Sequence, residues 1–154
     1  MRQTAILPGM VTRDLYDQDF LEWTVRNAGL LRAGRFGEAD IEHIAEEIED
    51  MGKSQRRALG SRLEVLLEHL LKWQFQPGGR SSSWESTIRI QRTKIAKLLR
   101  EMPSLSHGVA EEFADAYHTA VLAAVGETGL PRSAFPAACP FSSDQVLDEE
   151  FFPG

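Results

Sequence analysis

The sequence is poor in the features that mark secreted and membrane proteins. It has a single cysteine, Cys139, so no disulfide can form within the chain, and this usage fits a reducing cytosol. No uninterrupted apolar run reaches the roughly 18 residues of a membrane span. Residues 1–20 mix charged with apolar side chains and lack the apolar core of a signal peptide. We therefore expect a soluble, cytoplasmic protein that makes no membrane contact.

Sequence signatures of enzymes are also lacking. The 154 residues contain no phosphate-binding loop, dinucleotide fingerprint, zinc knuckle or nucleophile elbow. Many enzymes use one of these motifs to hold a nucleotide, a metal ion or a reacting serine. We therefore expect no cofactor, and we favour a protein that is not an enzyme.

The chain does have charge that is segregated along its length. Residues 1–50 hold five basic and eleven acidic residues, a net charge of −6, whereas residues 51–103 hold eleven and four, a net charge of +7. Residues 104–154 hold one and eight, a net charge of −7. A basic segment is one feature of nucleic-acid-binding proteins, but the acidity of the whole chain opposes phosphate binding. We favour pairing of the oppositely charged segments, within the chain or between subunits.

Apolar residues recur with a helical period along most of the chain, and no segment alternates as a strand does. The pattern predicts an all-α fold in one domain, residues 1–154: an antiparallel bundle of four main helices, then a Pro-rich C-terminal tail with a short terminal helix. The expected helices span residues 16–33, 41–76, 84–102, 105–127 and 143–151. Gly34, Pro103 and Gly129 stand where three of them should end, and Ser82 with Glu85 predicts a capping box.

The second predicted helix, residues 41–76, is the longest. With residues placed about 100° apart, one apolar face runs along its whole length and is expected to point into the bundle. Its members are Ile41, Ile44, Ala45, Ile48, Leu59, Leu63, Leu66 and Leu70. Gly52 interrupts this stripe, which leaves open a continuous helix, a kink, or a break into two helices.

Two helical pairs at i, i+3 spacing are candidate metal ligands: Asp40 with His43, and Asp115 with His118. Glu47 lies one turn beyond His43. However, His43, Glu47 and the carboxylates near them should point roughly 140 to 240° away from the apolar stripe, and His118 about 160° away from its own. We therefore interpret these side chains as solvated, and keep a metal site at a subunit interface as the alternative.

Two further places are candidate functional positions. His69 lies at the margin of the apolar face, where a histidine is more often a hydrogen-bonded boundary residue than a base or a ligand. Arg89, Lys97 and Arg100 make the outer face of the third helix basic. Because no aromatic residues interleave these charges to stack on bases, a solvated face is favoured over a nucleic-acid site.

Several blocks of the sequence resemble, in order, a bacterial family described as a domain of unknown function, number twenty-nine in its series. The matching blocks are residues 16–23, 30–36, 45–54, 69–74, 80–84 and the Pro-rich segment 129–148. Together they extend over nearly the whole chain. The resemblance implies an all-α bundle and brings no activity, cofactor or catalytic residue.

Three functions follow from these patterns. We favour a non-enzymatic helical module of a bacterial cytosolic protein, which binds another protein or forms a homo-oligomer. A metal-dependent or hydrolytic enzyme using His43, Glu47 and His69, or Asp115 and His118, is the first alternative. Nucleic-acid binding through the basic middle segment is the second.

Overall fold

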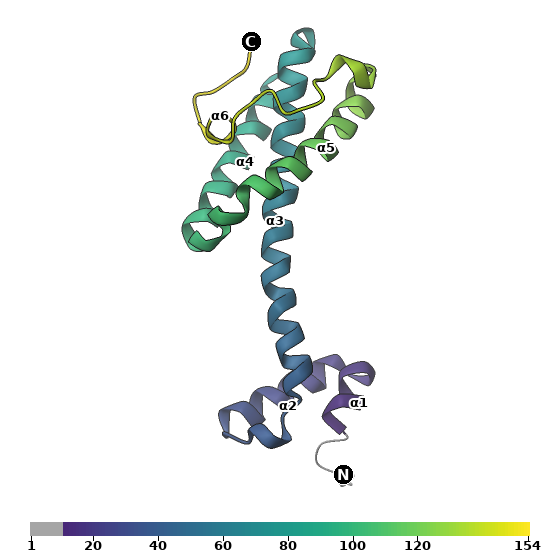
Figure 1. Ribbon diagram of the computed structural model, residues 1–154, viewed down its shortest axis with the longest axis vertical. Helices are drawn as coiled ribbons and strands as arrows, with labels where there is room; N and C mark the ends of the chain where they lie inside the picture. The colour runs from purple at the N-terminus through teal and green to yellow at the C-terminus, as the bar shows by residue number, and fades with distance from the viewer. Residues whose placement is uncertain (1–10) are drawn as a thin grey trace. The chain divides into compact units, whose positions relative to one another are not determined.

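The computed structural model describes residues 11–154, with side chains from Leu15 onward. Residues 1–10, which carry part of the expectation about a signal peptide, lie outside the described residues. All regular elements of the described chain are helices, so the all-α prediction is confirmed (Figure 1). Within this part of the chain, no helix combines the length and the apolar character that crossing a membrane requires.

Packing divides the chain into two compact units, residues 1–53 and residues 54–154. Helix α3, Ile41–Phe75, contributes to both, because the division falls inside it. That helix has nearly the predicted bounds, and it is continuous through Gly52, so the alternative of a break there is wrong. The single domain of residues 1–154 stays a prediction.

The first unit begins with two helices where one was predicted. Helix α1, Val11–Gln18, ends before Asp19, and α2, Phe20–Arg32, begins after it. The backbone of Asp19 leaves the helical conformation, and its carboxylate accepts a hydrogen bond from the backbone N–H of Glu22 at 3.0 Å. The prediction of one helix over 16–33 is therefore wrong, because Asp19 is an N-cap that the apolar periodicity conceals. Gly34, with φ of +72°, follows the end of α2 as expected. A short 3-10 helix, η1 (Phe36–Glu38), then leads to α3.

The second unit packs the rest of α3 with α4, Ser82–Glu101, and α5, Val109–Thr128. The connections are 3-10 helices, η2 (Pro77–Gly79) and η3 (Pro103–Gly108). The leucines of α3 from Leu59 onward are buried as predicted. They pack with apolar side chains of α4 and α5: Leu59, Leu63, Leu66, Leu67, Leu70, Leu71, Ile88, Ile95, Ala116, Tyr117, Ala120, Val121 and Ala124.

Local boundaries in this unit differ from prediction by a few residues. The N-cap of α4 is Ser81, whose hydroxyl accepts a hydrogen bond from the backbone N–H of Trp84, so the predicted capping box of Ser82 and Glu85 is wrong. Because η3 takes up the segment after Pro103, α5 begins at Val109 instead of residue 105. At its other end Gly129, with φ of +71°, is the C-cap as expected.

The C-terminal tail is part of the core of the second unit. After η4, Arg132–Ala134, it buries Phe135, Phe141 and Val146 among the apolar side chains of the helices. The terminal helix α6, Ser143–Leu147, is shorter than the predicted 143–151, because the backbone is extended again at Asp148.

Candidate functional site

A buried hydrogen-bonded cluster joins α2 to the start of α3 in the first unit. Asp40 is only 7% exposed, and its carboxylate accepts a hydrogen bond from the indole Nε1 of Trp23 at 3.1 Å. The backbone N–H of Asp40 donates to Oδ1 of Asn27 at 2.8 Å, and Nδ2 of Asn27 donates to the backbone oxygen of Trp23. Every polar group in this chain of contacts therefore has a partner, which a buried cluster needs.

His43 and Tyr16 extend the cluster to α1. Nδ1 of His43 lies 2.6 Å from Oδ2 of Asp40, and its ring stacks on that of Tyr16 with centroids 3.9 Å apart. The Tyr16 hydroxyl donates to Oε1 of Glu47 at 2.5 Å. His43 and Glu47 are thus half-buried and bonded, and their interpretation as solvated side chains is wrong. Helical periodicity could not predict these contacts, because Asp40 and His43 bind aromatic side chains that are distant in the sequence.

The charges of the Asp40–His43 pair support each other. The hydrogen bond to Asp40 raises the pKa of His43 above its ordinary value, although partial burial opposes this. Burial acts to raise the pKa of Asp40, but hydrogen bonds from His43 and Trp23 outweigh it and hold that pKa below its ordinary value. The favoured state is therefore an imidazolium on a carboxylate, which holds α1 and α2 against one side of α3.

The predicted metal ligands do not converge into a binding cluster. Among the described residues, no group of three or more His, Cys, Asp or Glu side chains is placed to hold a metal ion. His43 and Glu47 belong to the first unit, where Asp40 and Tyr16 are their partners. Asp115 and His118 lie exposed on α5. A metal site at a subunit interface stays a prediction.

The cluster decides which face of α3 is covered in the first unit. Asp40, His43 and Glu47 lie on one side of the helix, roughly 100° or more from the centre of its apolar stripe. Because α1 and α2 pack on that polar side, the stripe is left bare: Ile48 is 64% and Met51 is 68% exposed. The expectation that Ile41, Ile44, Ala45 and Ile48 point into a core is therefore wrong for this half of α3, where only Ile44 is half-buried.

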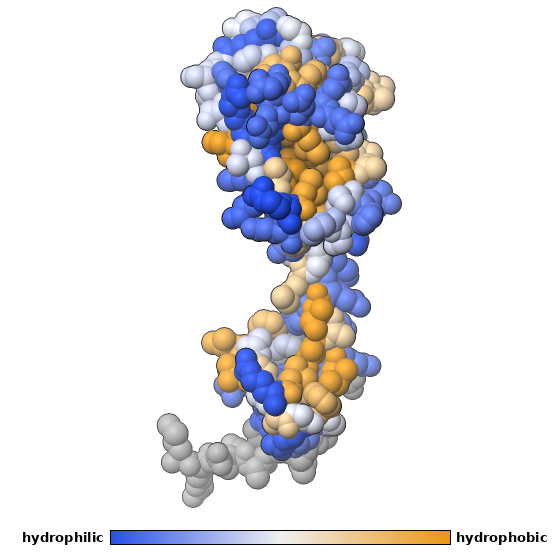
Figure 2. Space-filling view, turned by 90° about the vertical axis from the view of Figure 1, so that its left-hand side faces the viewer, coloured by the Kyte–Doolittle hydropathy of each residue, from blue (hydrophilic) through white to orange (hydrophobic). Residues whose placement is uncertain are grey.

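The exposed apolar surface of the first unit extends beyond α3. Trp23 is the only large apolar side chain of its described residues that is buried. Figure 2 shows apolar side chains at the surface of this unit. The large exposed apolar residues, called the apolar surface below, are Phe20, Leu21, Val25, Leu31, Phe36, Ile41, Ile48 and Met51. Exposed apolar patches that exceed a few hundred Å² are uncommon on monomeric proteins and often mark binding sites.

His69 lies in the second unit, half-buried as expected. Its Nδ1 is 2.8 Å from the backbone oxygen of Val65, one helical turn earlier. Burial lowers the pKa of His69 below its ordinary value. Its neighbour Lys72 is buried, lies 3.4 Å from a carboxylate oxygen of Glu68 and sits over the ring of Trp84. His69 is therefore a hydrogen-bonded residue at the edge of the core, between buried and exposed positions.

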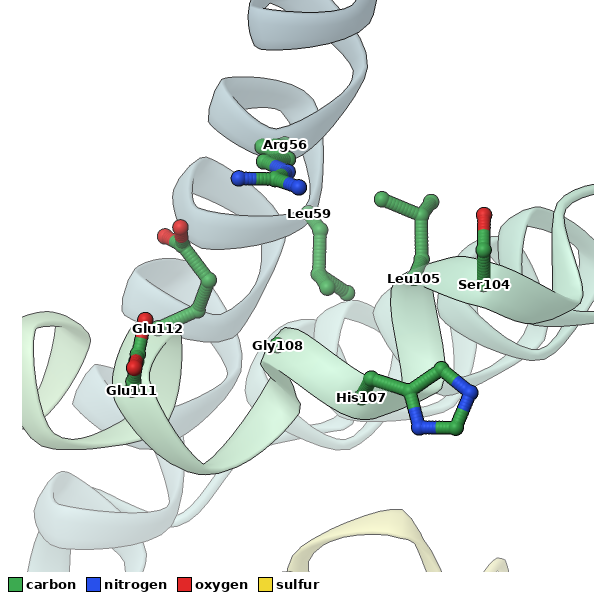
Figure 3. A pocket seen from close by; sticks show the side chains of 8 residues that line it. All are labelled: Arg56, Leu59, Ser104, Leu105, His107, Gly108, Glu111 and Glu112. Carbon is green, nitrogen blue, oxygen red and sulfur yellow. The ribbon is translucent and has the colours of Figure 1, made fainter.

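A cavity of about 190 Å³ opens in the second unit beside α3, η3 and the start of α5. Its charged lining includes Arg56, Glu111 and Glu112, and Figure 3 shows the imidazole of His107 apart from the carboxylate of Glu112. A Cβ at Gly60 would lie 2.7 Å from Oε2 of Glu112, so an alanine there would displace the end of that flexible side chain.

The predicted basic surface on α4 is exposed, and its charges have acidic neighbours. Nη2 of Arg89 donates to Glu85 at 2.9 Å, and Nζ of Lys97 lies 3.8 Å from Glu101. Arg100 is exposed near the end of the helix. Nucleic-acid binding through these residues stays a prediction, and these pairs reduce the charge that would drive it.

Sequence reasoning missed two arginines that hold the C-terminal tail. Arg92 is 3% exposed and donates to the backbone oxygens of Val146 and Phe151, each at 2.8 Å. Arg80 donates to the backbone oxygens of Trp73 and Gly154. A signal for Arg92 was present: it is spaced to lie on the apolar stripe of α4, between the buried Ile88 and Ile95.

His43 and His69 should titrate on opposite sides of the ordinary histidine pKa, because Asp40 raises one value and burial lowers the other. NMR titration of the imidazole protons measures both. Asp40→Asn should bring the pKa of His43 down and leave that of His69, the internal control, unmoved. If His43 does not respond, its bond to Asp40 does not form in solution.

The same titration has a consequence for stability. A histidine whose pKa is raised by folding stabilises the folded state when protonated. For His43 this contribution is complete below its ordinary pKa of 6.5 and is lost as the pH rises through the folded value. Hydrogen exchange of the first unit should therefore quicken over that range beyond the intrinsic effect of pH, and Asp40→Asn should remove the excess.

The sequence matches one family model, described as Domain of unknown function DUF29, over residues 15–152. Neither a curated protein nor a solved structure matches the chain.

Proposed function

The chain belongs to the DUF29 family, and within it we propose that this protein is a non-enzymatic helical module that binds another protein chain through the apolar surface of its first unit. The observation that carries the proposal is the bare apolar stripe of α3, since Ile48 and Met51 are each about two-thirds exposed. The polar cluster around Asp40 then serves to fix α1 and α2 so that this stripe stays open.

The energetics support a binding role. Complete burial of a large apolar side chain contributes about 1.5–3 kcal/mol, so even part of the apolar surface offers a partner a substantial gain. The second unit contrasts with this, because its leucines are buried in a core and its large exposed apolar residues are Ile90 and Leu122. The module thus has one unit built around a core and one unit whose apolar side chains remain available.

The remaining features of the proposal follow from the chain itself. In the second unit the short connections η2 and η3 favour an antiparallel order of α3, α4 and α5. The single cysteine fits a bacterial cytoplasm as the compartment. The partner is a protein, either another chain or a second copy of this one.

Photo-crosslinking tests the proposal directly. Benzoylphenylalanine placed at Ile48 should crosslink the chain to protein in living cells, and the added substitution Met51→Glu should suppress the product. The matched control is the same probe at Leu122, which is 56% exposed but stands in the second unit. Equal yields at the two positions, or no response to Met51→Glu, would contradict a binding role for the first unit.

A further inference from the structure

We propose that the occupant of the bare stripe of α3 is a basic amphipathic helix of another protein, which docks along residues 41–52. The inference rests on the proposed function, because it names the chemistry of the partner that the same surface binds. The docking surface lies within the first unit. Two features of α3 support the choice of partner: the spacing of its exposed apolar residues and the sign of the charges beside them.

The apolar residues of this segment have the spacing that one helix presents to another. Ile41, Ile44, Ile48 and Met51 follow one another at intervals of three, four and three residues, which is the heptad spacing of a helix–helix seam. Ile44 is half-buried, and the other three are exposed. The side chains of an extended segment alternate between two faces and match this spacing poorly. The occupant is therefore a helix whose apolar residues repeat every three or four positions.

Small residues beside this seam leave room for long side chains of the partner. Ala45 and Gly52 lie on the margin of the stripe that faces away from α1 and α2. Ala45 is exposed, and a Cβ at Gly52 would meet nothing within 4 Å. Glu49 stands beyond them on the same margin. A lysine or arginine of the partner can lay its methylene stem over these small residues and bring its charge to that carboxylate.

The charges beside the seam favour a basic partner. Glu46 and Glu49 are exposed on the margin away from α1 and α2, and Asp50 follows them. Residues 41–50 contain five acidic residues and no Lys or Arg. The next basic residue, Lys53, lies 4.0 Å from Asp50 and so balances only one of these charges. Basic residues that flank the apolar face of a docking helix would complement the rest.

The same charges disfavour other occupants. A second copy of this chain would bring two first units together, and residues 1–50 of each carry a net charge of −6. Nucleic acids and anionic membranes are negatively charged, so this acidic surface repels them as well. A cationic helix is instead attracted before its apolar residues are buried, which speeds the encounter.

Two synthetic peptides test the chemistry of the partner on the full chain. Both have leucine at heptad positions a and d and alanine at b, c and f, but one has lysine at e and g and the other has glutamate there. Fluorescence anisotropy should show saturable binding of the lysine peptide, weakened by salt, and no binding of the glutamate peptide. If the two bind equally, or if the lysine peptide does not bind at low salt, the proposal is overturned.

Variants of the chain show whether the lysine peptide occupies α3. Met51→Glu should raise the Kd of the lysine peptide about tenfold or more, because it sets a charge in the apolar seam. Glu46→Lys combined with Glu49→Lys should raise that Kd about tenfold, because repulsion replaces attraction at two positions. These positions are exposed, so the helix should be retained, as circular dichroism can check.

Matched control variants lie on α5 in the second unit. Leu122→Glu sets the same charge on another exposed apolar position, and Asp115→Lys combined with Glu127→Lys makes the same change of net charge as the double variant of α3. Both should leave the Kd of the lysine peptide unchanged. If they weaken binding as much as the variants of α3 do, the peptide responds to the net charge of the chain and the docking site on α3 is wrong.

The crosslink at Ile48 separates this inference from the proposed function. Mass spectrometry of the crosslinked product identifies the captured segment, which should have apolar residues at heptad spacing and more Lys and Arg than Asp and Glu. If the segment is acidic, or if it belongs to a second copy of this chain, the basic helix is wrong and the binding role stands with another partner. If no Met51-dependent crosslink forms, both proposals are wrong.

Discussion

Replacing Arg92 with methionine is expected to destabilise the second unit by about 3–6 kcal/mol, because the two short hydrogen bonds of its charged side chain are lost, each contributing about 1.5–3 kcal/mol, together with a longer one to Glu149. The guanidinium holds the backbone oxygens of Val146 and Phe151 at 2.8 Å and lies over the ring of Phe152. Methionine fills much of the space of the arginine stem but has no donor. Urea unfolding measures the loss, and limited proteolysis should show earlier cleavage after residue 140.

Arg100→Met is the matched control, since it removes an exposed arginine from the same helix and should change stability by no more than about 0.5 kcal/mol. Arg92→Lys should give an intermediate loss, because one ammonium cannot reproduce the planar fork of donors. Equal stability of Arg92→Met and Arg100→Met would show that the hydrogen bonds of Arg92 to the tail add no net stability.

Replacing Trp23 with alanine is expected to unfold α1 and α2 while the second unit remains folded. Truncation of a buried tryptophan costs about 3–5 kcal/mol, and here it also leaves Asp40 without its indole donor. Trp23 is 4% exposed and is the main apolar anchor of its unit, so no other core compensates. Hydrogen exchange with mass spectrometry should show lost protection in residues 11–40 and retained protection in residues 59–75.

Two variants calibrate this result. Trp23→Phe keeps an aromatic ring at this position and removes the hydrogen bond and part of the buried volume, so protection should fall less than in Trp23→Ala. Leu21→Ala removes a side chain that is 75% exposed on the same helix and should have little effect at low protein concentration. If Trp23→Ala removes protection from both units equally, the two fold cooperatively as the single domain that the sequence predicts.

The helical architecture was predictable because its signals are local. The start of α3 at Ile41 follows an aspartate, and its end at Phe75, just before Pro77, lies within one residue of the prediction. Gly129 marks the end of α5 for the same kind of reason, since a left-handed backbone favours glycine. Two of the boundaries that were wrong, at Asp19 and Ser81, depend on which of several polar residues uses its side chain as a cap.

The candidate site was less predictable, because contacts between distant residues create it. The spacing of Asp40 and His43 was visible in the sequence, but their partners Trp23 and Tyr16 were not. Arg92 showed the opposite difficulty: its place on an apolar stripe was visible, whereas the tail carbonyls that bind it come from more than fifty residues away.

The sequence by itself determined the all-α class, the length of α3, its apolar stripe and the reversal of charge along it. Each is a property of residues near one another in the chain, where helix geometry fixes the relation. Only the tertiary structure decided which side of α3 is covered in each unit. The apolar stripe shows which face of a helix gains free energy when it is buried. In the first unit, however, the hydrogen bonds of Asp40, His43 and Glu47 hold α1 and α2 on a different face of α3. The sequence therefore predicted the apolar face of α3, whereas only the structure showed that this face is exposed in the first unit.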